Sequence, residues 1–382
     1  IPLKVFSQKL TTFPACLERA AELLGNGHYM YATLKSRSHF FEGYLLANSN
    51  RNPNFTHGER ALREFRIALQ WEPNLSQAYW QMSLVFGYNL LQPDSAEHYA
   101  RIAMELQPSW IYPYITLAGI FMNKYRQFDR AKTYLEKAVQ IDSNRVWNMM
   151  GNYHLEQKEF AKAEKYYHKA IDFDTTNIQA YSNLGVIYLF TQRYKEAEKY
   201  FLKVIDLDST YFYAFINLGL IYNNTSRFVE AEKCFIKSLE LDSTIVNTYN
   251  NLGNTYTNMK RFKEAEKYFL KGINLDSTFV ELYSNLGNVY TLTQRYAVAE
   301  KYYRKAIEVD STFGNAYYNL TCALSLQDLT DKAFVQLELL IQKGSEKYEN
   351  LQDDPDLQNM RAKNEKWNAL MHKYFPDHFK AK

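Results

Sequence analysis

The chain has 382 residues, 46% of them hydrophobic and 23% charged, so it can bury a core and is not an intrinsically disordered chain. Its 45 lysines and arginines against 42 aspartates and glutamates give a net charge of +3, which is no electrostatic footprint for nucleic acid. With 14 glycines and 9 prolines the chain has few helix breakers, which favours long helices.

Residues 1–36 are expected to form an N-terminal lead-in and a capping helix. The segment 17–24 has a helical pattern and fits either a half-repeat or the cap that a repeat stack needs at its end. The first ten residues lack the apolar core of a signal peptide, and the absence of a starting methionine indicates a piece of a longer protein or a processed form. The longest near-apolar run, 110–122, is too short to cross a bilayer, so we predict no membrane association and a cytoplasmic location.

Residues 37–344 carry repeated helix pairs, and the first three pairs are irregular. The first contains Tyr44 and Phe65, with a polar insertion from Asn48 to Gly58. The second and third follow over about 80–108 and 114–142. The step from Asp142 to the next marked aromatic residue is two residues shorter than in later repeats.

A strict period of 34 residues follows. The glycines that mark it are Gly151, Gly185, Gly219, Gly253 and Gly287. An aromatic residue stands four positions before each glycine, a tyrosine usually three after, an alanine twelve after and an aromatic residue sixteen after. This spacing predicts two helices per repeat, which approach closely where the small residues face the aromatic rings.

The connecting residues also repeat. Short polar turns such as 191–193 separate the two helices, and Asp-Ser or Asp-Thr follows each second helix. We expect the Ser or Thr to cap the next helix, with Thr278 and Glu281 as a capping box. The repeated block Glu-Ala-Glu-Lys of the second helices is expected to be a solvated outer face with ion pairs along the helix.

Residues 345–382 are expected to form a C-terminal capping helix and tail. A helix from Pro355 to Tyr374, begun by the acidic residues 353–356, would place one apolar stripe against the stack. That stripe consists of Leu357, Met360, Trp367, Leu370, Met371 and Tyr374.

The 34-residue pattern resembles the tetratricopeptide repeat family, with Ser or Thr in place of the usual final proline from Ser143 onward. The resemblance implies an all-α fold, a right-handed superhelical solenoid of about nine antiparallel helix pairs. It also implies a protein-protein interaction scaffold, whose concave groove would be lined by the first helix of each pair.

The groove positions are rich in asparagine. An asparagine stands two residues before each marker glycine from Gly185 onward, and again one period after the last of them. These residues are Asn183, Asn217, Asn251, Asn285 and Asn319. The same stripe holds Asn152, Asn247, Asn254 and Asn288. Asparagine is a poor helix former, so its recurrence needs a reason. Carboxamides can grip the backbone of an extended polypeptide, and the repeat arm of O-GlcNAc transferase, to which this stretch is similar, has such a ladder. The alternative is that these residues bond to neighbouring backbone or stay solvated.

The sequence gives little support for a carboxylate clamp, a catalytic site or a metal site. Arg145 is the one basic candidate for a clamp of the kind that holds acidic C-termini, and a single arginine is not a clamp. Catalytic motifs are absent, the eight histidines show no metal-ligand spacing, and Cys16, Cys234 and Cys322 are interpreted as reduced core thiols. We therefore predict a non-enzyme without a cofactor or metal.

Two further hypotheses stay open. In bacteria, repeats that resemble these are often attached to kinase, cyclase or caspase-like signalling domains, so the partner is either another protein or another domain of the same polypeptide. The chain is alternatively a self-association module, with Tyr29, Tyr31, Phe40, Phe41 and Tyr44 as the suspected patch.

Overall fold

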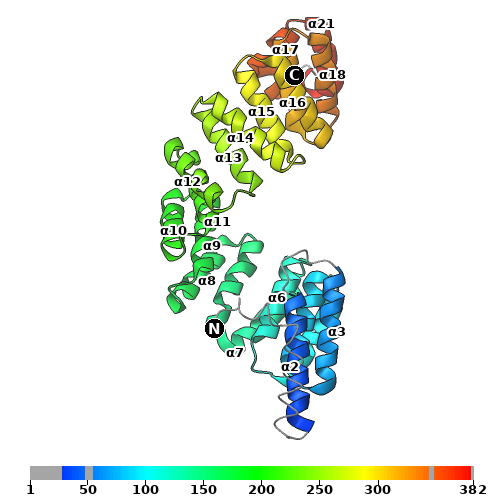
Figure 1. Cartoon of the computed structure of the whole chain (residues 1–382). Coiled ribbons are helices and arrows are strands. Elements are labelled where there is room, and N and C mark those ends of the chain that lie inside the picture. The colour runs from blue at the N-terminus through cyan, green and yellow to red at the C-terminus, as the bar shows by residue number, and fades with distance from the viewer. Residues whose placement is uncertain (1–27, 48–54, 344–347, 380–382) are drawn as a thin grey trace. The chain divides into compact units, whose positions relative to one another are not determined.

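The computed structural model describes residues 28–47, 55–343 and 348–379, which consist of helices and the short turns between them (Figure 1). The predicted all-α fold is confirmed. The chain divides into two compact units, residues 1–183 and 184–382, and the division falls inside helix α9 (Ile178–Phe190).

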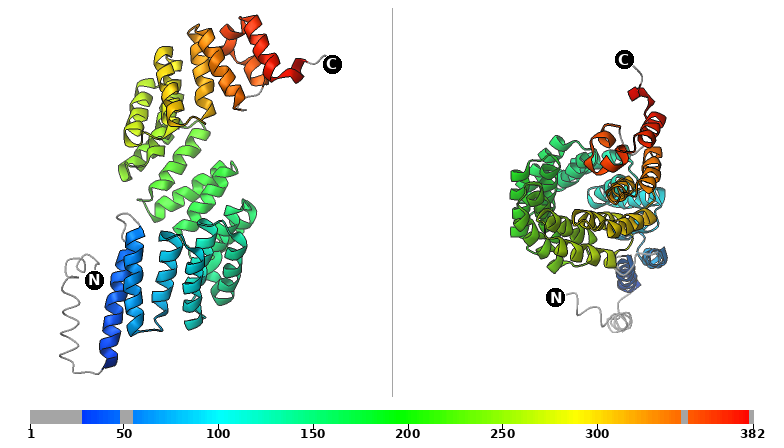
Figure 2. Two further views of the ribbon diagram at one scale, coloured as in Figure 1. Left: turned by 90° about the vertical axis from the view of Figure 1, so that its right-hand side faces the viewer. Right: turned by 90° about the horizontal axis from the view of Figure 1, so that it is seen from above.

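Unit 1 is a row of helices, each packed against the next along the chain (Figure 2). The row consists of α2 (His28–Ala47), α3 (Phe55–Trp71), α4 (Ser76–Leu84) with the π-helical turn η2 (Val85–Asn89), α5 (Pro93–Leu106), α6 (Tyr112–Asn123), α7 (Phe128–Glu156) and α8 (Phe160–Phe173). Helix α2 runs across the expected boundary between residues 36 and 37, and the segment 17–24 lies outside the described residues. Since α3 already begins at Phe55, the expected insertion is shorter than predicted.

The short step after the third repeat has a structural cause in α7. Asp142 interrupts this helix with φ −152° and ψ 94°, so α7 is two helices joined at a kink. The Asp142 carboxylate accepts a hydrogen bond from the backbone N–H of Asn144 at 3.1 Å and so starts the second helix at once. The turn at Asp142 is therefore two residues shorter than the turns between later repeats, which explains the shorter step in the sequence.

Unit 2 contains the regular pairs. After α9 come α10 (Tyr194–Leu207), α11 (Phe212–Asn224), α12 (Phe228–Leu241), α13 (Val246–Asn258), α14 (Phe262–Leu275), α15 (Val280–Leu292), α16 (Tyr296–Val309), α17 (Gly314–Leu326) and α18 (Thr330–Gln342). Counted over the described residues, with α7 as two helices, the chain forms the nine pairs that were expected.

The marker glycines allow the two helices of a pair to touch. A Cβ atom on Gly253 would lie 2.4 Å from a ring carbon of Phe269, and one on Gly287 would lie 2.5 Å from Tyr303. Both rings are fully buried. The close approach predicted from the spacing of glycine and aromatic residue is confirmed.

The turn inside each pair contains a feature that the sequence did not reveal. In each of these turns that the structure describes, one residue adopts the left-handed conformation, with φ between 55° and 60°, although it is not glycine. These residues are Leu91, Arg126, Lys158, Gln192, Ser226, Lys260, Gln294 and Asp328. The following N–H closes the first helix; in one case Arg261 donates to the carbonyl of Tyr256 at 2.8 Å.

The turns between repeats depend on aspartate. The carboxylate of Asp276 accepts hydrogen bonds from the backbone N–H of Thr278 at 2.8 Å and from its hydroxyl at 2.6 Å. Asp174, Asp208, Asp242 and Asp310 make the same pair of bonds. The residue before α15 is Phe279, which provides no side-chain cap. The predicted capping role of the Ser or Thr, including the capping box at Thr278, is therefore wrong, because the aspartate of the turn already holds the threonine hydroxyl.

The C-terminal cap is broken into short helices rather than forming one helix from Pro355 to Tyr374. It consists of α19 (Tyr348–Asp353), η3 (Pro355–Leu357), α20 (Gln358–Arg361), α21 (Asn364–Tyr374) and η4 (Pro376–Phe379). The short helices before the break at residues 362–363 pack on the last repeat, since η3 and α20 contact α17 and α20 also contacts α18. Leu357, Met360, Trp367, Leu370 and Met371 of the predicted stripe are nevertheless buried, and Tyr374 is half-buried.

Candidate functional site: the open face of the first helices

The first helices of unit 2 leave one stripe of side chains exposed or half-buried. The stripe follows the second residue of each helix and the residues four and seven positions later, which share one side of a helix. On α17 the last of these positions is Cys322, which is buried and does not belong to the stripe. We call these residues the open face: Tyr213, Asn217, Leu220, Asn247, Asn251, Asn254, Glu281, Asn285, Asn288, Asn315 and Asn319. Because α11 contacts α13, α13 contacts α15 and α15 contacts α17, the stripes lie next to one another.

Several of the predicted ladder residues hold neighbouring repeats together. The Nδ2 of Asn285 donates to the Oδ1 of Asn250 at 2.8 Å, and that of Asn319 donates to Asn288 at 3.1 Å. In unit 1, Asn183 donates to the Oδ1 of Asn152 at 2.9 Å. These carboxamides therefore have a structural role. The Nδ2 of Asn319 also donates to the hydroxyl of Ser284 at 3.4 Å, whereas Asn285 keeps a second N–H.

A buried tyrosine fixes two of the accepting asparagines. The hydroxyl of Tyr167 donates to the Oδ1 of Asn152 at 2.7 Å, and that of Tyr303 donates to Asn288 at 2.8 Å. Burial raises the pKa of both phenols above their ordinary value, so both stay protonated donors. The corresponding ring beside Asn254 is Phe269, which has no hydroxyl to donate.

The asparagine side chains in the middle of the open face make no hydrogen bonds to neighbouring repeats in the part of the chain that the structure describes. Asn217 donates to the carbonyl of Tyr213 in its own helix at 2.9 Å. Among the described residues, the side chains of Asn247, Asn251 and Asn254 on α13 make no hydrogen bond to another side chain or to the backbone. A carboxamide offers two donors and an oxygen acceptor, so α13 presents three groups that match a polypeptide backbone.

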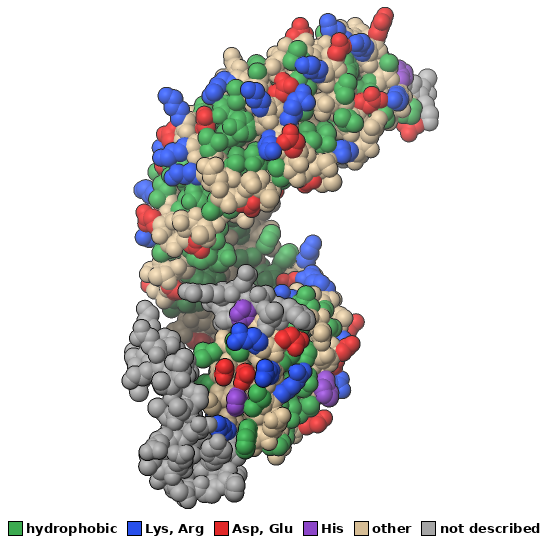
Figure 3. All heavy atoms as spheres, turned by 45° about the vertical axis from the view of Figure 1, so that its right-hand side comes forward, with side chains coloured by type: hydrophobic (Ala, Val, Ile, Leu, Met, Phe, Trp, Pro, Cys, Tyr) green, Lys and Arg blue, Asp and Glu red, His purple; other side chains and the backbone are tan. Residues whose placement is uncertain are grey.

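The open face is almost neutral, in contrast to the rest of unit 2. Glu281 is the single charged side chain among its residues. Elsewhere on the visible face of unit 2, lysines and arginines are interspersed with aspartates and glutamates (Figure 3). A neutral surface of donors and acceptors is suited to an uncharged backbone and not to a phosphate chain.

A network between repeats was missed in the sequence. Arg261 stacks on the ring of Tyr256 at 4.5 Å, and both side chains donate to Glu232 of the preceding repeat, Arg261 at 2.9 Å and Tyr256 at 2.8 Å. Tyr222 and Arg227 bond to Glu198 in the same way, and Tyr290 bonds to Glu266 with Arg295 at 3.8 Å. The 34-residue spacing of the arginines was the available signal.

The expected outer face is consequently wrong for one glutamate of each block. The first glutamate, such as Glu264, pairs with the arginine of the turn at 2.9 Å, as predicted for an exposed helical ion pair. The side chain of the second, Glu232, is 18% exposed and belongs to the interface between repeats. Burial and then the hydrogen bond to Glu232 raise the pKa of Tyr256 above its ordinary value.

Among the described residues, neither the two cysteines nor the one cluster of histidine and glutamates forms a second site. Cys234 and Cys322 are free thiols, and burial raises the pKa of Cys234 to about 11, so it is an unreactive thiol. The ligand atoms of His39, Glu42 and Glu64 lie within 4.8 Å of one another. His39 contacts Glu64 directly at 2.6 Å, which is shorter than the roughly 3.3 Å between two ligands of a tetrahedral zinc ion, so in this arrangement they bond to each other.

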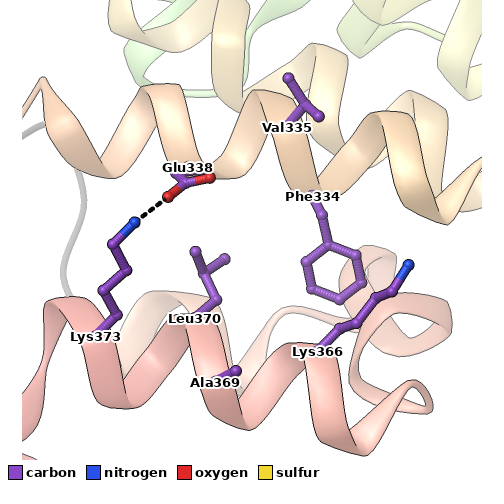
Figure 4. Close-up of a pocket in the computed structure, with 7 residues that line it drawn as sticks. All are labelled: Phe334, Val335, Glu338, Lys366, Ala369, Leu370 and Lys373. Carbon is purple, nitrogen blue, oxygen red and sulfur yellow. Dashed lines mark hydrogen bonds and ion pairs between the residues drawn. The ribbon is translucent and has the colours of Figure 1, made fainter.

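A hollow between α18 and α21 belongs to the C-terminal cap (Figure 4). Phe334 and Leu370 face one another in it, while Lys373 reaches across to Glu338 at 2.6 Å. Lys366 at the other edge pairs with Asp331. The hollow is therefore the seam by which α21 is attached to the last repeat.

No helix within the described residues is both long enough and apolar enough to cross a membrane.

Comparison with known proteins agrees with the period of the repeats. A family model described as tetratricopeptide repeat matches residues 142–210, 209–278 and 243–312. A curated relative, the BBSome complex member BBS4 of Mus musculus, is 32% identical over 72 residues, which are 19% of this chain and 14% of the relative. The chain thus matches only a small part of that relative.

Solved structures show partial likeness. The pilF protein of Pseudomonas aeruginosa is 21% identical with a TM-score of 0.48, covering 54% of this chain and 94% of that one. The C-terminal part of a repeat protein from Cytophaga hutchinsonii is 19% identical with a TM-score of 0.48, covering 63% and 99%. YrrB, described as having an unusual peptide-binding site, is 21% identical with a TM-score of 0.41, covering 48% and 96%.

Proposed function

The repeats of residues 142–312 belong to the tetratricopeptide repeat family, and on that premise we propose that the chain is a non-enzymatic scaffold for protein interaction. It holds an extended polypeptide segment against the open face of unit 2. The observation that carries the proposal is the set of uncommitted carboxamides on α13, namely Asn247, Asn251 and Asn254. The segment belongs to another protein or to another domain of the same polypeptide, and the location proposed is cytoplasmic.

The distance between the first helices of successive repeats suits an extended polypeptide chain. Packed helices lie about 8–10 Å apart, and an extended chain advances about 3.3 Å per residue. Each repeat therefore spans about three residues of ligand, and its carboxamides meet backbone groups whatever the ligand sequence. The bond of Asn285 to Asn250 of the neighbouring repeat supports the proposal, because it fixes the orientation of the remaining donor of Asn285.

A photo-cross-linking experiment tests the position of the ligand. Asn247 is exposed on α13, whereas Asn274 is exposed on the second helix α14 of the same repeat. A benzophenone amino acid placed at 247 is expected to capture unfolded or peptide ligands from a defined peptide pool, and the same group at 274 is not. Equal capture at both positions would overturn the assignment to the open face.

Affinity measurement on a captured peptide tests the chemistry. The double substitution Asn251→Ala and Asn254→Ala is expected to weaken binding about tenfold, since each lost hydrogen bond contributes about 0.5–1.5 kcal/mol. Asn274→Ala is the matched control and is expected to leave affinity unchanged. Unchanged affinity in the double variant would remove the ladder from the proposal while leaving a scaffold that binds elsewhere.

Self-association remains the second candidate, because α2 exposes Phe41, Tyr44 and Leu45 on its surface. Phe40, by contrast, packs on Phe65, and the side chains of Tyr29 and Tyr31 lie outside the described ones. Light scattering over a range of concentrations, with Phe41→Ser and Leu45→Ser, separates this candidate from the first.

A further inference from the structure

The four helices that form the open face contain a single charged residue. Helices α11, α13, α15 and α17 have no lysine, arginine, histidine or aspartate, and their one glutamate is Glu281 in the first turn of α15. The side chain of Glu281 is exposed and belongs to the open face. A polypeptide that lies along these helices therefore meets one charge on them, and that charge is negative.

The carboxylate of Glu281 has no partner in the part of the chain that the structure describes, where it forms neither an ion pair nor a hydrogen bond. Between residues 194 and 342, each of the other ten glutamates pairs with an arginine or a lysine, at N···O distances of 2.6 to 3.8 Å. The glutamate that departs from this rule lies on the surface to which we assign the ligand.

A role in starting the helix does not account for Glu281. An acidic residue in the first turn stabilises a helix through the helix dipole. The same position is nevertheless uncharged in the neighbouring first helices, where it is Tyr213 on α11, Asn247 on α13 and Asn315 on α17. None of these three helices has an acidic residue in its first turn, and each begins without a side-chain cap, as α15 does. The repeat thus folds without a carboxylate at this position.

The surroundings of Glu281 favour a cation. The exposed carboxamides of Asn247 and Asn315 stand at the same position on the two neighbouring helices, and among the described residues neither side chain makes a hydrogen bond. Their oxygens can accept the N–H groups of an ammonium or guanidinium that the carboxylate does not use. An acidic side chain would be repelled by Glu281, and an apolar one would remove water from the charge without replacing it.

We propose that the polypeptide held by the open face carries a lysine or arginine that pairs with Glu281, and that this ion pair sets the register of the bound segment. The inference rests on the proposed function, because the asparagines hold the backbone of the segment without reading its sequence. Since each repeat spans about three residues of an extended ligand, the basic residue lies about three residues from the part of the ligand that contacts α13.

The test offers three sets of synthetic peptides to the full chain with the benzophenone amino acid at position 247. All peptides have the same length of about sixteen residues and uncharged flanks of the same composition, and the central residue is lysine, glutamine or glutamate. Cross-linking is expected to capture the lysine set about threefold more than the glutamine set, and the glutamate set about threefold less, which is the size of effect of an exposed ion pair. The preference is expected to shrink as salt is raised from about 50 mM to about 500 mM.

Variants assign the preference to one carboxylate. Glu281→Gln is expected to abolish the difference between the lysine and glutamine sets. Glu308→Gln is the matched control, because it makes the same change of charge at a side chain that is 65% exposed on α16, the second helix of the same repeat, and it is expected to keep the preference. Glu281→Gln combined with Asn315→Glu moves the carboxylate one repeat farther from position 247. Mass spectrometry of the cross-linked peptides is then expected to find lysine about six residues from the cross-linked residue, instead of about three.

The outcomes separate this inference from the proposed function. Capture at position 247 without a preference for lysine, or a preference that survives Glu281→Gln, overturns the pairing with Glu281 and leaves the open face as the ligand site. Equal capture at positions 247 and 274 overturns the open face, and this inference with it. Gln179 occupies the position of Glu281 in α9, so Glu281→Gln is expected to fold like the parent chain, which circular dichroism checks.

Discussion

Two neighbouring repeats of unit 2, α13 with α14 and α15 with α16, share one packing scheme and differ in one atom at its centre. In both, the marker glycine lies against a fully buried aromatic ring. The second repeat has Tyr303, whose hydroxyl fixes Asn288, while the first has Phe269 and leaves Asn254 without a bond. The comparison teaches that the ring at the core of a repeat decides whether the asparagine next to the marker glycine is hydrogen-bonded within the protein.

The largest effect on stability is expected at the marker glycines, where the two repeats have the same packing. Gly253→Ala and Gly287→Ala place a methyl group within 2.4–2.5 Å of a buried ring carbon, so each is expected to lower the free energy of unfolding by about 1–3 kcal/mol, despite the better helix propensity of alanine. Urea unfolding followed by circular dichroism measures this. Asn258→Ala, exposed at the end of α13, is the control; an unchanged midpoint for either glycine variant would contradict the shared packing scheme.

Exchanging the two rings sharpens the comparison directly. Tyr303→Phe removes the 2.8 Å bond to Asn288 and is expected to cost about 1 kcal/mol. Phe269→Tyr is expected to add up to about 1 kcal/mol by donating to Asn254, and to weaken ligand binding because Asn254 is then occupied. Urea midpoints and peptide affinity give both readouts. Shifts of the same sign in the two variants would show that the hydroxyl does not determine the difference.

The left-handed residues of the two turns test a feature that both repeats share. Lys260 and Gln294 have φ of 58°, a conformation that costs little only for glycine. Lys260→Gly and Gln294→Gly are each expected to raise the free energy of unfolding by about 0.5–1 kcal/mol. Lys263→Gly, in the first turn of α14, is the opposite control and is expected to lower it. A loss of stability at 260 or 294 would argue against the left-handed turn.

The smallest expected effect is on the pH dependence of stability, through the aspartates of the turns between repeats. Hydrogen bonds from the hydroxyl and then the N–H of Thr278 hold the pKa of Asp276 below its ordinary value, and Thr312 does the same for Asp310. A lowered pKa stabilises the fold above the unfolded-state pKa, and that contribution is lost as the pH falls through the folded-state pKa. Thermal midpoints between pH 6 and pH 2 are expected to fall less in Asp276→Asn than in the parent chain. A steeper fall in that variant would reverse the assigned sign.

Some of this structure could be predicted from sequence because the 34-residue period records contacts within a pair. The contact of Gly253 with Phe269 follows from the periodicity of two helices joined by a short turn, and the structure confirms it. The role of Asp276 could not be separated from that of Thr278, since both residue types cap helices and form turns, and the geometry of the turn decides between them.

Contacts between repeats were harder to predict. Glu232 looks like any exposed glutamate of a helix, and its place beside Tyr256 and Arg261 depends on the angle at which one repeat stacks on the next. The same angle decides that the side chain of Asn285 bonds to Asn250, while the side chain of Asn251 bonds to no described residue. Asparagines that recur at regular intervals in the sequence thus differ from one another in the hydrogen bonds that they make.

The link of tyrosine, arginine and glutamate recurs at three successive interfaces of unit 2, which has a consequence for how the stack opens. When coupling between neighbouring repeats is strong relative to the stability of each repeat, a linear array unfolds in blocks. Amide protons from α10 to α16 would then exchange with solvent together, while the ends fray independently. A polypeptide that lies across several repeats therefore meets a surface that is already ordered along its length, and the entropy lost on binding is its own alone.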